Sequence, residues 1–212
     1  MIEFDGWTIA FFVIALVPGV ILHELMHGVV ANAFGDPTAR EAGRLSLNPI
    51  RHVDPFGTII LPGMLLAASA IGGPGIVFGY AKPVPVNSGK LRNPRSHMLF
   101  VALAGPFTNL VLAGLAALLI QIVQPTTLRT AQFAVIWVLT NVVLFVFNMI
   151  PLPPLDGSEL IARVLPRRAL AVYRSLSPYG FAVLFLLLLA FPTVLSGVMG
   201  PVIQTLLRVL LG

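Results

Sequence analysis

Residues 20–30 read VILHELMHGVV, and they place two histidines and a glutamate inside one of the most apolar stretches of the chain. Of the 212 residues, 57% are hydrophobic and only 10% are charged, and the mean hydropathy is +0.94. This composition is too apolar for an ordinary soluble domain, and several runs are long enough to cross a bilayer. The sequence therefore predicts one integral membrane domain, residues 1–212, in contact with the lipid bilayer.

Five apolar segments are expected to build this domain, and most reach the ~20 residues that a helix needs to cross hydrocarbon. They lie at about Trp7–Phe34, Phe56–Tyr80, His97–Val123, Ala131–Ile150 and Tyr179–Met199. The tail PVIQTLLRVLLG is shorter, and we expect it to form a short C-terminal helix at a surface or against the bundle. Residues 158–176, with their cluster of arginines, are expected to form an interfacial helix. The expected fold is an all-α polytopic membrane protein with about four transmembrane helices.

The basic residues indicate the orientation, because positively charged loops remain in the cytoplasm. Of the 13 lysines and arginines, 11 lie in three loops, which follow the first, second and fourth apolar segments. The N-terminus, with Glu3 and Asp5, and the link QPTTLRTAQ are then outside the cell. An acidic N-terminus is also unlike a signal peptide, so we expect the first helix to be retained. The net charge of +5 is interpreted as basic loops facing anionic lipid, and not as a nucleic-acid surface.

The segment Phe56–Tyr80 has basic loops on both sides, which conflicts with a single crossing. Its sequence FGTIILPGMLLAASAIGGPGIVFGY is interrupted by Pro62-Gly63 and by GGPG at residues 72–75. Proline removes a helix hydrogen bond and glycine weakens a helix. We therefore expect a re-entrant hairpin over residues 56–80, and the alternative is a kinked helix that crosses once.

The motif HELMH, residues 23–27, fits the pattern H-E-x-x-H. On a helix, His23 and His27 share a face and can bind one zinc ion, while Glu24 beside them can hold the attacking water. Core histidines with a surface glutamate are the alternative, but an ionisable residue at membrane depth is costly and usually functional. A helix that starts near Trp7 reaches His23 after about 24 Å at ~1.5 Å per residue. The active site is thus expected near the cytoplasmic side.

A catalytic zinc ion needs a third protein ligand and an open position for water. The chain has no cysteine, so this ligand must be a histidine or a carboxylate. Asp156, in NMIPLPPLDGSEL, follows prolines that end the fourth apolar segment at the expected depth of HELMH. The alternative is a helix cap, since Asp156 and Glu159 together resemble a capping box.

These motifs, in this order, resemble those of the site-2 protease family, the intramembrane zinc metalloproteases. The matching stretches are HELMH, GRLSLNPIRHVDPFGTIILP, FGYAKPVPVN, ALAGPFTNL and NMIPLPPLDG. The resemblance implies that His23, His27 and Asp156 bind one Zn²⁺ per chain and that Glu24 is the general base. It also implies a short form, because the loops leave no room for a PDZ-like insert and no nucleotide-binding tail is recognisable.

Two asparagines are candidates for substrate binding. Asn109, in GPFTNL, and Asn148, at the start of the proline element, are both expected at membrane depth. Their amides could hold the substrate backbone or the tetrahedral oxyanion. The alternative is hydrogen bonding between helices, worth about 1 kcal/mol in a membrane.

Leu45 and Leu47 alternate with polar residues, which is the period of a strand. Residues 38–48 are therefore expected to form a short β-like cytoplasmic stretch whose edge binds an unwound substrate by strand addition. The alternative is a surface connection between helices. His52 and Asp54 could be further ligands or could orient the site, but Asn48-Pro49 and Asp54-Pro55 are both turn-forming dipeptides, which favours a turn.

The expected function is a zinc-dependent endopeptidase of the cell membrane that acts in regulated intramembrane proteolysis. It would cleave peptide bonds within or next to the transmembrane segment of a membrane-protein substrate, with Glu24 moving the proton from water to the leaving amine. A metal transporter and an inactive protease-like scaffold are the alternatives. A homo-oligomer is compatible with the sequence, and no nucleic-acid partner is expected.

Overall fold

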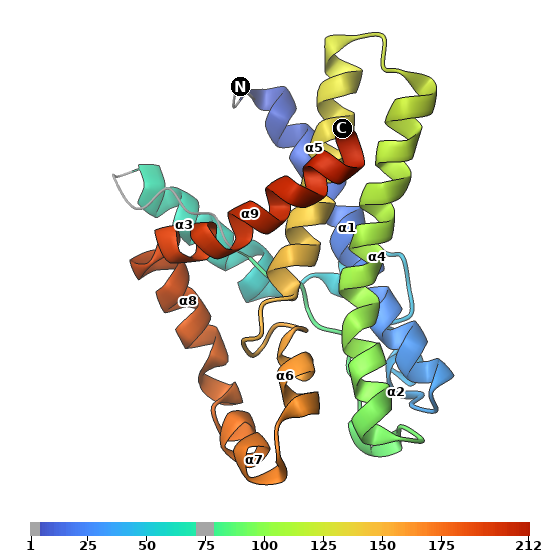
Figure 1. Ribbon diagram of the computed structural model, residues 1–212, viewed down its shortest axis with the longest axis vertical. Coiled ribbons are helices and arrows are strands. Elements are labelled where there is room, and N and C mark those ends of the chain that lie inside the picture. Colours follow the sequence, from blue (N-terminus) through green and yellow to red (C-terminus); the bar gives the residue numbers. More distant parts are fainter. Residues whose placement is uncertain (1–4, 71–78) are drawn as a thin grey trace.

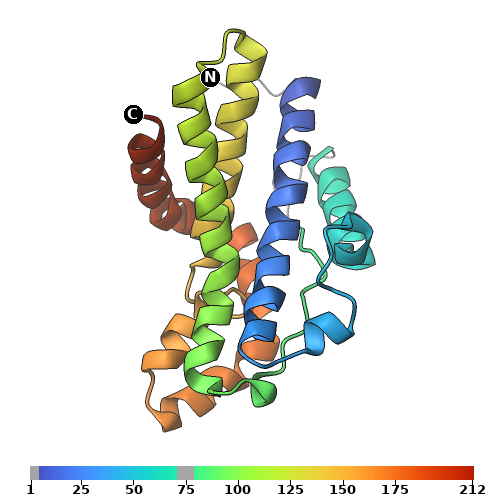
Figure 2. The same cartoon turned by 90° about the vertical axis from the view of Figure 1, so that its right-hand side faces the viewer.

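The computed structural model describes residues 5–70 and 79–212, and within these ranges it is helical and contains no β-strand. Its core is a bundle of three long helices, each of which packs against the other two (Figures 1 and 2). These helices are α1 (Gly6–Ala33), α4 (Pro94–Val123) and α5 (Leu128–Asn148). The expected all-α fold is therefore confirmed.

Capping side chains define where the core helices begin, and small residues at their interfaces allow the helices to pack closely. The Asp5 carboxylate accepts a hydrogen bond from the Thr8 N–H at 2.8 Å and caps α1. Thr127 and Thr130 form a capping box at the start of α5. In a membrane, helices associate through close packing rather than through exclusion of water. Accordingly, the main core cluster contains several small or β-branched residues: Ala113, Ala117, Val138, Val142 and Val146.

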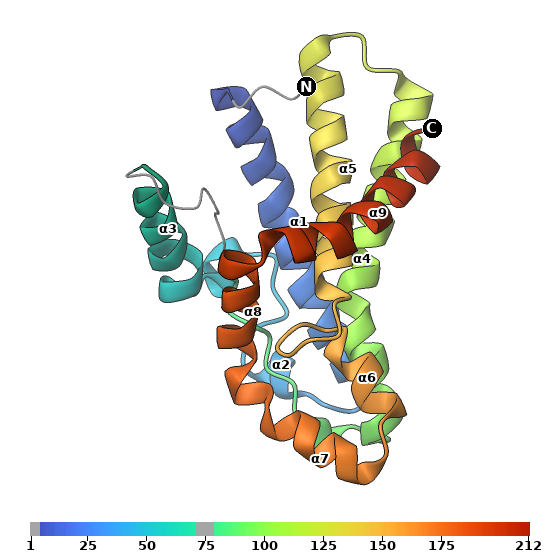
Figure 3. The ribbon, with the colours of Figure 1, turned by 60° about the vertical axis from the view of Figure 1, so that its left-hand side comes forward.

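Shorter elements surround this core. They are α2 (Thr38–Glu41), η1 (Pro49–His52), η2 (Pro55–Ile60), α3 (Leu61–Ala70), η3 (Ser88–Lys90), α6 (Ser158–Val164), α7 (Arg167–Ser175), η4 (Ser177–Tyr179), α8 (Gly180–Ala190) and α9 (Pro192–Leu211). Helix α9 packs across α4 and α5, whereas α3 and α8 stand to one side of the core (Figure 3).

Five helical stretches of the described chain are long and apolar enough to cross a membrane. They are Gly6–Ala33, Pro94–Val123, Leu128–Asn148, Arg168–Ala190 and Thr193–Leu211. The polytopic architecture is confirmed, and five stretches qualify by length and composition where about four crossing helices were expected. Phe191 is non-helical (φ −134°, ψ 50°), because the following Pro192 disfavours the helical region at the residue before it. The chain beyond this break forms a 20-residue helix, not the short surface helix predicted from the tail.

Two further expectations need correction. Residues 158–176 do not form one interfacial helix, because Leu165 adopts an extended conformation before Pro166 and separates α6 from α7. Residues 38–48 are not a β-like stretch: they begin with the helix α2, and the part after Gly43 pairs with no strand in the described chain. The alternation of Leu45 and Leu47 arises from packing against α1, not from a sheet.

The two ends of the segment 56–80 meet. The Tyr80 N–H donates to the Gly57 carbonyl at 3.0 Å, and the Thr58 hydroxyl donates to the Tyr80 carbonyl at 2.9 Å. A segment that starts and finishes at one place has the arrangement of the predicted hairpin rather than of a single crossing. Residues 71–78, which include the GGPG interruption, lie outside the described residues.

The charged loops gather at opposite ends of the bundle as the basic residues predict. Lys90 forms an ion pair with Glu41 at 3.7 Å, and Arg95 donates to the Arg163 carbonyl at 3.1 Å, so contacts join all three basic loops at one end. At the other end, Arg129 pairs with Asp5 at 2.9 Å. The Arg129 guanidinium, together with the Thr8 hydrogen bonds, lowers the pKa of Asp5 to about 2.

Cysteine labelling tests this arrangement, because the chain has no native cysteine. Single cysteines in place of Glu41 and Lys90 should react with a membrane-impermeant maleimide only in inside-out vesicles. A cysteine in place of Thr126, in the link between α4 and α5, should react only in intact cells. Labelling of positions 41 and 90 from opposite sides would contradict the hairpin and require that 56–80 crosses the membrane.

Candidate metal centre

Three potential ligand atoms converge between α1 and the loop after α5. His23 and His27 are buried on one face of α1, and their Nε2 atoms lie 3.1 Å apart. Oδ2 of Asp156 lies 3.1 Å from Nε2 of His23 and 3.4 Å from Nε2 of His27. Among the described residues, this is the group of His, Asp and Glu side chains whose geometry is suited to hold a metal ion.

Hydrogen bonds on the far side of each ring determine its tautomer. Nδ1 of His27 lies 2.7 Å from the Val101 carbonyl, which can only accept, so this Nδ1 carries the proton and donates. Nδ1 of His23 lies 2.7 Å from Oδ1 of Asn109. The Asn109 amide is oriented by its Nδ2, which donates to the Gly19 carbonyl at 3.1 Å. With Nδ1 as the donor, each imidazole in its neutral form has Nε2 available as a ligand atom, as in metal-binding histidines.

The residues present fit a metal ion. Two bare imidazole nitrogens and a carboxylate oxygen all offer lone pairs to one point, and Oδ2 of Asp156 is buried without a hydrogen-bond donor. Such an arrangement needs a cation. The neighbouring helix lies directly against these atoms at Gly105, where a Cβ atom would lie 2.3 Å from Nε2 of His27 and 2.7 Å from Nε2 of His23, so only glycine leaves the ligand atoms clear.

The loop after α5 directs Asp156 toward α1. The Gly157 N–H donates to the Asn148 carbonyl at 2.7 Å, which folds the loop back against the end of α5. Only glycine fits at position 157, since a Cβ would lie 2.3 Å from the Met149 carbonyl oxygen. Helix α6 has Gly157 as its N-cap residue, with no side-chain hydrogen bond at the cap. The capping-box alternative for Asp156 and Glu159 is therefore not formed.

A chain of buried amides supports His23. Asn109 and Asn141 are both fully buried, and Nδ2 of Asn109 donates to Oδ1 of Asn141 at 3.0 Å. Nδ2 of Asn141 in turn donates to the Trp137 carbonyl at 3.0 Å. These contacts join α1, α4 and α5 beside the metal site. The Asn109 amide is enclosed and its polar atoms are used within the protein, which favours hydrogen bonding between helices, and its substrate role stays a prediction.

The second asparagine remains accessible. Asn148 is partly buried, and its Nδ2 donates to the carbonyl of Leu144 in the preceding turn of α5 at 2.9 Å. This bond is the usual one for a polar side chain inside a membrane helix. Oδ1 of Asn148 and the second amide hydrogen make no hydrogen bond with the described residues, so a substrate role stays a prediction.

Glu24 lies beside the two histidines but belongs to a different set of contacts. Its Oε2 accepts a hydrogen bond from the backbone N–H of Val84 at 2.8 Å. Val84 stands between Pro83 and Pro85, which have no N–H, so the PVP sequence offers a single backbone donor and directs it at Glu24. The Val84 side chain packs on α1 at Gly28, where a Cβ would lie 3.0 Å from it. A lone valine between prolines gives no sequence signal of this contact.

His52 and Asp54 lie outside the ligand group. His52 is buried, and its Nε2 is 2.7 Å from the Ser46 carbonyl. Asp54 caps η2 by accepting from the N–H groups of Phe56 and Gly57 at 3.1 and 2.7 Å. Both residues thus stabilise the connection between α1 and the hairpin, which agrees with the turn interpretation.

Fold and site together define a class, a helical membrane protein with a buried His-His-Asp metal site. The comparisons with known proteins define the family: residues 11–134 match the model of Peptidase family M50. The chain belongs to this family, so the resemblance to site-2 proteases is confirmed. Family membership also implies zinc as the metal.

Three similar proteins share the name "Putative zinc metalloprotease". YwhC of Bacillus subtilis is 40% identical over 190 residues, which cover 86% of this chain and 81% of YwhC. Rip2 of Mycobacterium tuberculosis is 33% identical over 197 residues, or 91% of this chain and 67% of Rip2. MJ0611 of Methanocaldococcus jannaschii is 30% identical over 163 residues, or 75% of this chain and 74% of MJ0611. No solved structure matches the chain significantly.

The close contact at Gly105 gives a direct test of the metal centre. Gly105→Ala adds a methyl group that would clash with the ligand nitrogens of His23 and His27 and displace them, while alanine favours the helix. We expect zinc affinity to fall by at least ~100-fold, the upper end of the loss when a supporting residue of a metal site is changed. Zinc content after equilibrium dialysis is the measurement.

The matched control is Gly114→Ala on the same helix, where a Cβ meets nothing within 4 Å. This variant should bind zinc like the wild type, and both variants should retain their helix content by circular dichroism. If Gly105→Ala binds zinc as tightly as the wild type, the ion does not lie between His23, His27 and Asp156.

Proposed function

We propose that the protein is an intramembrane zinc-dependent endopeptidase, which cleaves peptide bonds within or next to transmembrane segments of membrane proteins in regulated intramembrane proteolysis. In this proposal His23, His27 and Asp156 hold the zinc ion and Glu24 is the general base. The observation that carries the proposal is the convergence of the ligand atoms of His23, His27 and Asp156, with Gly105 packed against them and the Glu24 carboxylate one residue along the same helix.

The chemistry divides between the metal and the chain. Bound zinc would activate water and polarise the scissile carbonyl. Glu24 accepts the proton of the attacking water, whose oxygen adds to the carbonyl carbon, and delivers that proton to the nitrogen as the C–N bond breaks. The Val84 N–H engages one carboxylate oxygen of Glu24 and fixes the side-chain rotamer. The other oxygen is then free to exchange the proton.

Substrate must reach this site in an extended form, since the carbonyls of a helix are occupied by hydrogen bonds. The segment from Leu45 to Asn48 runs beside α1, and no described residue hydrogen-bonds to the N–H or C=O groups of Leu45 and Leu47. These free groups support a role for Leu45 and Leu47 in binding the substrate main chain, although no strand is formed. Of the two asparagines expected to contact the substrate backbone, Asn148 is the one whose Oδ1 makes no hydrogen bond with a described residue.

The orientation in the cell membrane is part of the same proposal. The three basic loops meet at the end of the bundle that holds the C-terminal part of α1, and positive loops remain in the cytoplasm. The N-terminus is then outside, and the metal centre opens toward cytoplasmic water.

Replacement of the base separates the enzyme from its alternatives. Glu24→Gln keeps the shape and the Val84 contact but cannot accept a proton, so cleavage should fall by ~10²–10⁴-fold while zinc binding persists. New N-termini of single-span proteins in proteoliposomes, identified by mass spectrometry, are the measurement. Glu41→Gln, which changes an exposed carboxylate, is the control and should cleave normally.

The wild type also distinguishes the alternatives. If it binds zinc, yields no new termini and carries zinc across vesicles, it is a transporter. If it neither cleaves peptides nor carries zinc, it is a scaffold.

The Val84 contact predicts a second effect on catalysis. Val84→Pro removes the N–H that holds Glu24, and a hydrogen bond to a charged group contributes about 1.5–3 kcal/mol. We expect kcat to fall by ~10–100-fold with KM and zinc affinity unchanged, since neither substrate nor metal loses a contact. Val84→Ala retains the N–H and should keep most of the wild-type kcat. Equal losses of kcat in the two variants would assign the effect to side-chain packing instead.

A further inference from the structure

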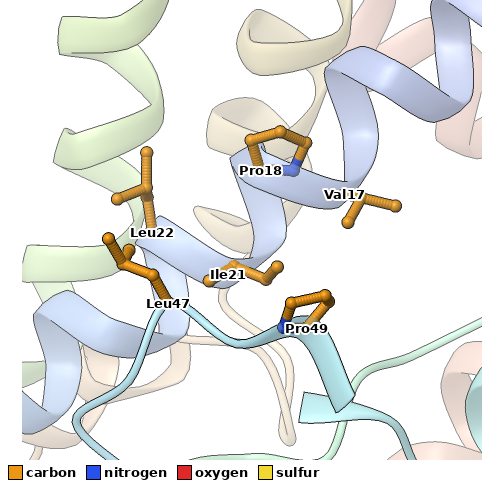
Figure 4. Close-up of a pocket in the computed structure, with 6 residues that line it drawn as sticks. All are labelled: Val17, Pro18, Ile21, Leu22, Leu47 and Pro49. Carbon is orange, nitrogen blue, oxygen red and sulfur yellow. The ribbon is translucent and has the colours of Figure 1, made fainter. Parts of the chain in front are cut away.

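An apolar groove lies beside the metal helix. Its volume is about 400 Å³, and it is formed between one face of α1 and the segment that crosses in front of it (Figure 4). Its lining consists entirely of apolar residues: Val17, Pro18, Ile21, Leu22, Leu47 and Pro49. A cleft of this size falls at the lower end of the ~300–1,000 Å³ of small-ligand sites and has room for a large side chain.

The groove is next to the proposed base. Val17, Ile21 and Glu24 are spaced by four and three residues, so they share one face of α1. At ~1.5 Å per residue, Glu24 lies about 4.5 Å along the helix axis from Ile21. A peptide whose scissile bond lies at Glu24 would therefore place a neighbouring side chain at the groove.

The wall opposite α1 indicates what kind of molecule would occupy the groove. Leu47 is 64% exposed, and its backbone N–H and C=O make no hydrogen bond with any described residue. Unpaired backbone groups beside a membrane-spanning helix are costly. An extended peptide can pair with these groups, whereas a lipid tail offers neither donors nor acceptors. The groove and its wall thus fit a peptide with apolar side chains better than they fit a lipid.

We propose that this groove is the side-chain subsite that selects the bond to be cut, and that it takes one large apolar side chain of an extended transmembrane substrate. This inference rests on the proposed function. Side chains of an extended chain alternate between faces, so the residue in the groove points toward α1 while its neighbours point away. The lining has no charged or hydrogen-bonding side chain, so a charged residue at that position is rejected because it would lose its hydration.

Changes to the groove should alter specificity rather than activity in general. Val17→Phe reduces the space and should lower kcat/KM for a substrate with leucine at the groove position, relative to one with alanine, by ~10–200-fold, the range for one methylene in an apolar pocket. Leu47→Ala enlarges the space and should shift the ratio toward phenylalanine over leucine. The substrates are single-span peptides that differ only at residues around the wild-type cut, reconstituted in liposomes.

Val13→Phe is the matched control, because Val13 lies one turn from Val17 on α1 and is 49% exposed outside the groove. Its substrate ratios should equal those of the wild type. If both groove variants lower cleavage of all substrates by one factor, or if the control changes the ratio equally, the subsite is overturned. A wild type without cleavage would overturn the proposed function, and the subsite with it.

A binding measurement keeps the test independent of turnover. Glu24→Gln should form cross-links to a single-span peptide that carries benzoylphenylalanine at the groove position, and mass spectrometry should locate these cross-links at Val17 or Leu47. The same peptide with the probe at the next position, which faces away from α1, should not cross-link to these residues. Cross-links from the groove position only to lipid would refute the subsite.

Discussion

Burial of three ligand atoms in an apolar bundle is the constraint on which the rest of this structure depends. Two imidazole nitrogens and a carboxylate oxygen lie within 3.1–3.4 Å of one another, and a bound cation would stabilise this group in its apolar surroundings. Each surrounding contact serves that arrangement. The Asn109 side-chain oxygen and the Val101 carbonyl accept hydrogen bonds from Nδ1 of His23 and His27, respectively. The hydrogen bond from Asn109 to Asn141 joins the core helices beside the metal site.

Close approach of backbone and side chains is the second requirement, and glycine provides it at defined points. Gly105 leaves room at the ligand atoms, Gly157 lets the Asp156 loop fold against α5, and Gly28 lets Val84 reach Glu24. Prolines provide the complementary effect, because Pro83 and Pro85 restrict the backbone and leave only one N–H between them. The family motifs are therefore explained as much by the absence of side-chain atoms as by reactive groups.

The sequence predicted the elements whose chemistry is unusual in an apolar chain. HELMH could be recognised because ionisable groups rarely occur at that depth, and the grouping of the basic loops followed from their charge. Asp156 was distinguished from a helix cap only by the resemblance of NMIPLPPLDG to the family motif. The incorrect predictions concern segments whose local sequence pattern is compatible with more than one structure. Leu45 and Leu47 alternate because one of them packs on α1 and the other lines a groove, without any strand partner. Hydropathy also does not predict the helix breaks before Pro166 and Pro192, because these arise from the backbone restriction that a proline imposes on the preceding residue. The role of Asn109 depended on a partner in another helix, which no local pattern contains.

These contacts place the metal centre between a polar end of the bundle and an apolar face of α1. The basic loops and the ends of α1 and α5 gather polar groups at one end of the bundle, where Asp156 and Val84 approach the metal helix. About one turn toward the N-terminus of α1, the groove beside the helix is lined only by apolar residues. Hydrolysis of a membrane-embedded peptide needs both conditions, because water must reach the carbonyl while the flanking side chains remain in an apolar environment. Glu24 lies at the boundary, since the face of α1 that carries it continues toward the N-terminus as the groove at Val17 and Ile21.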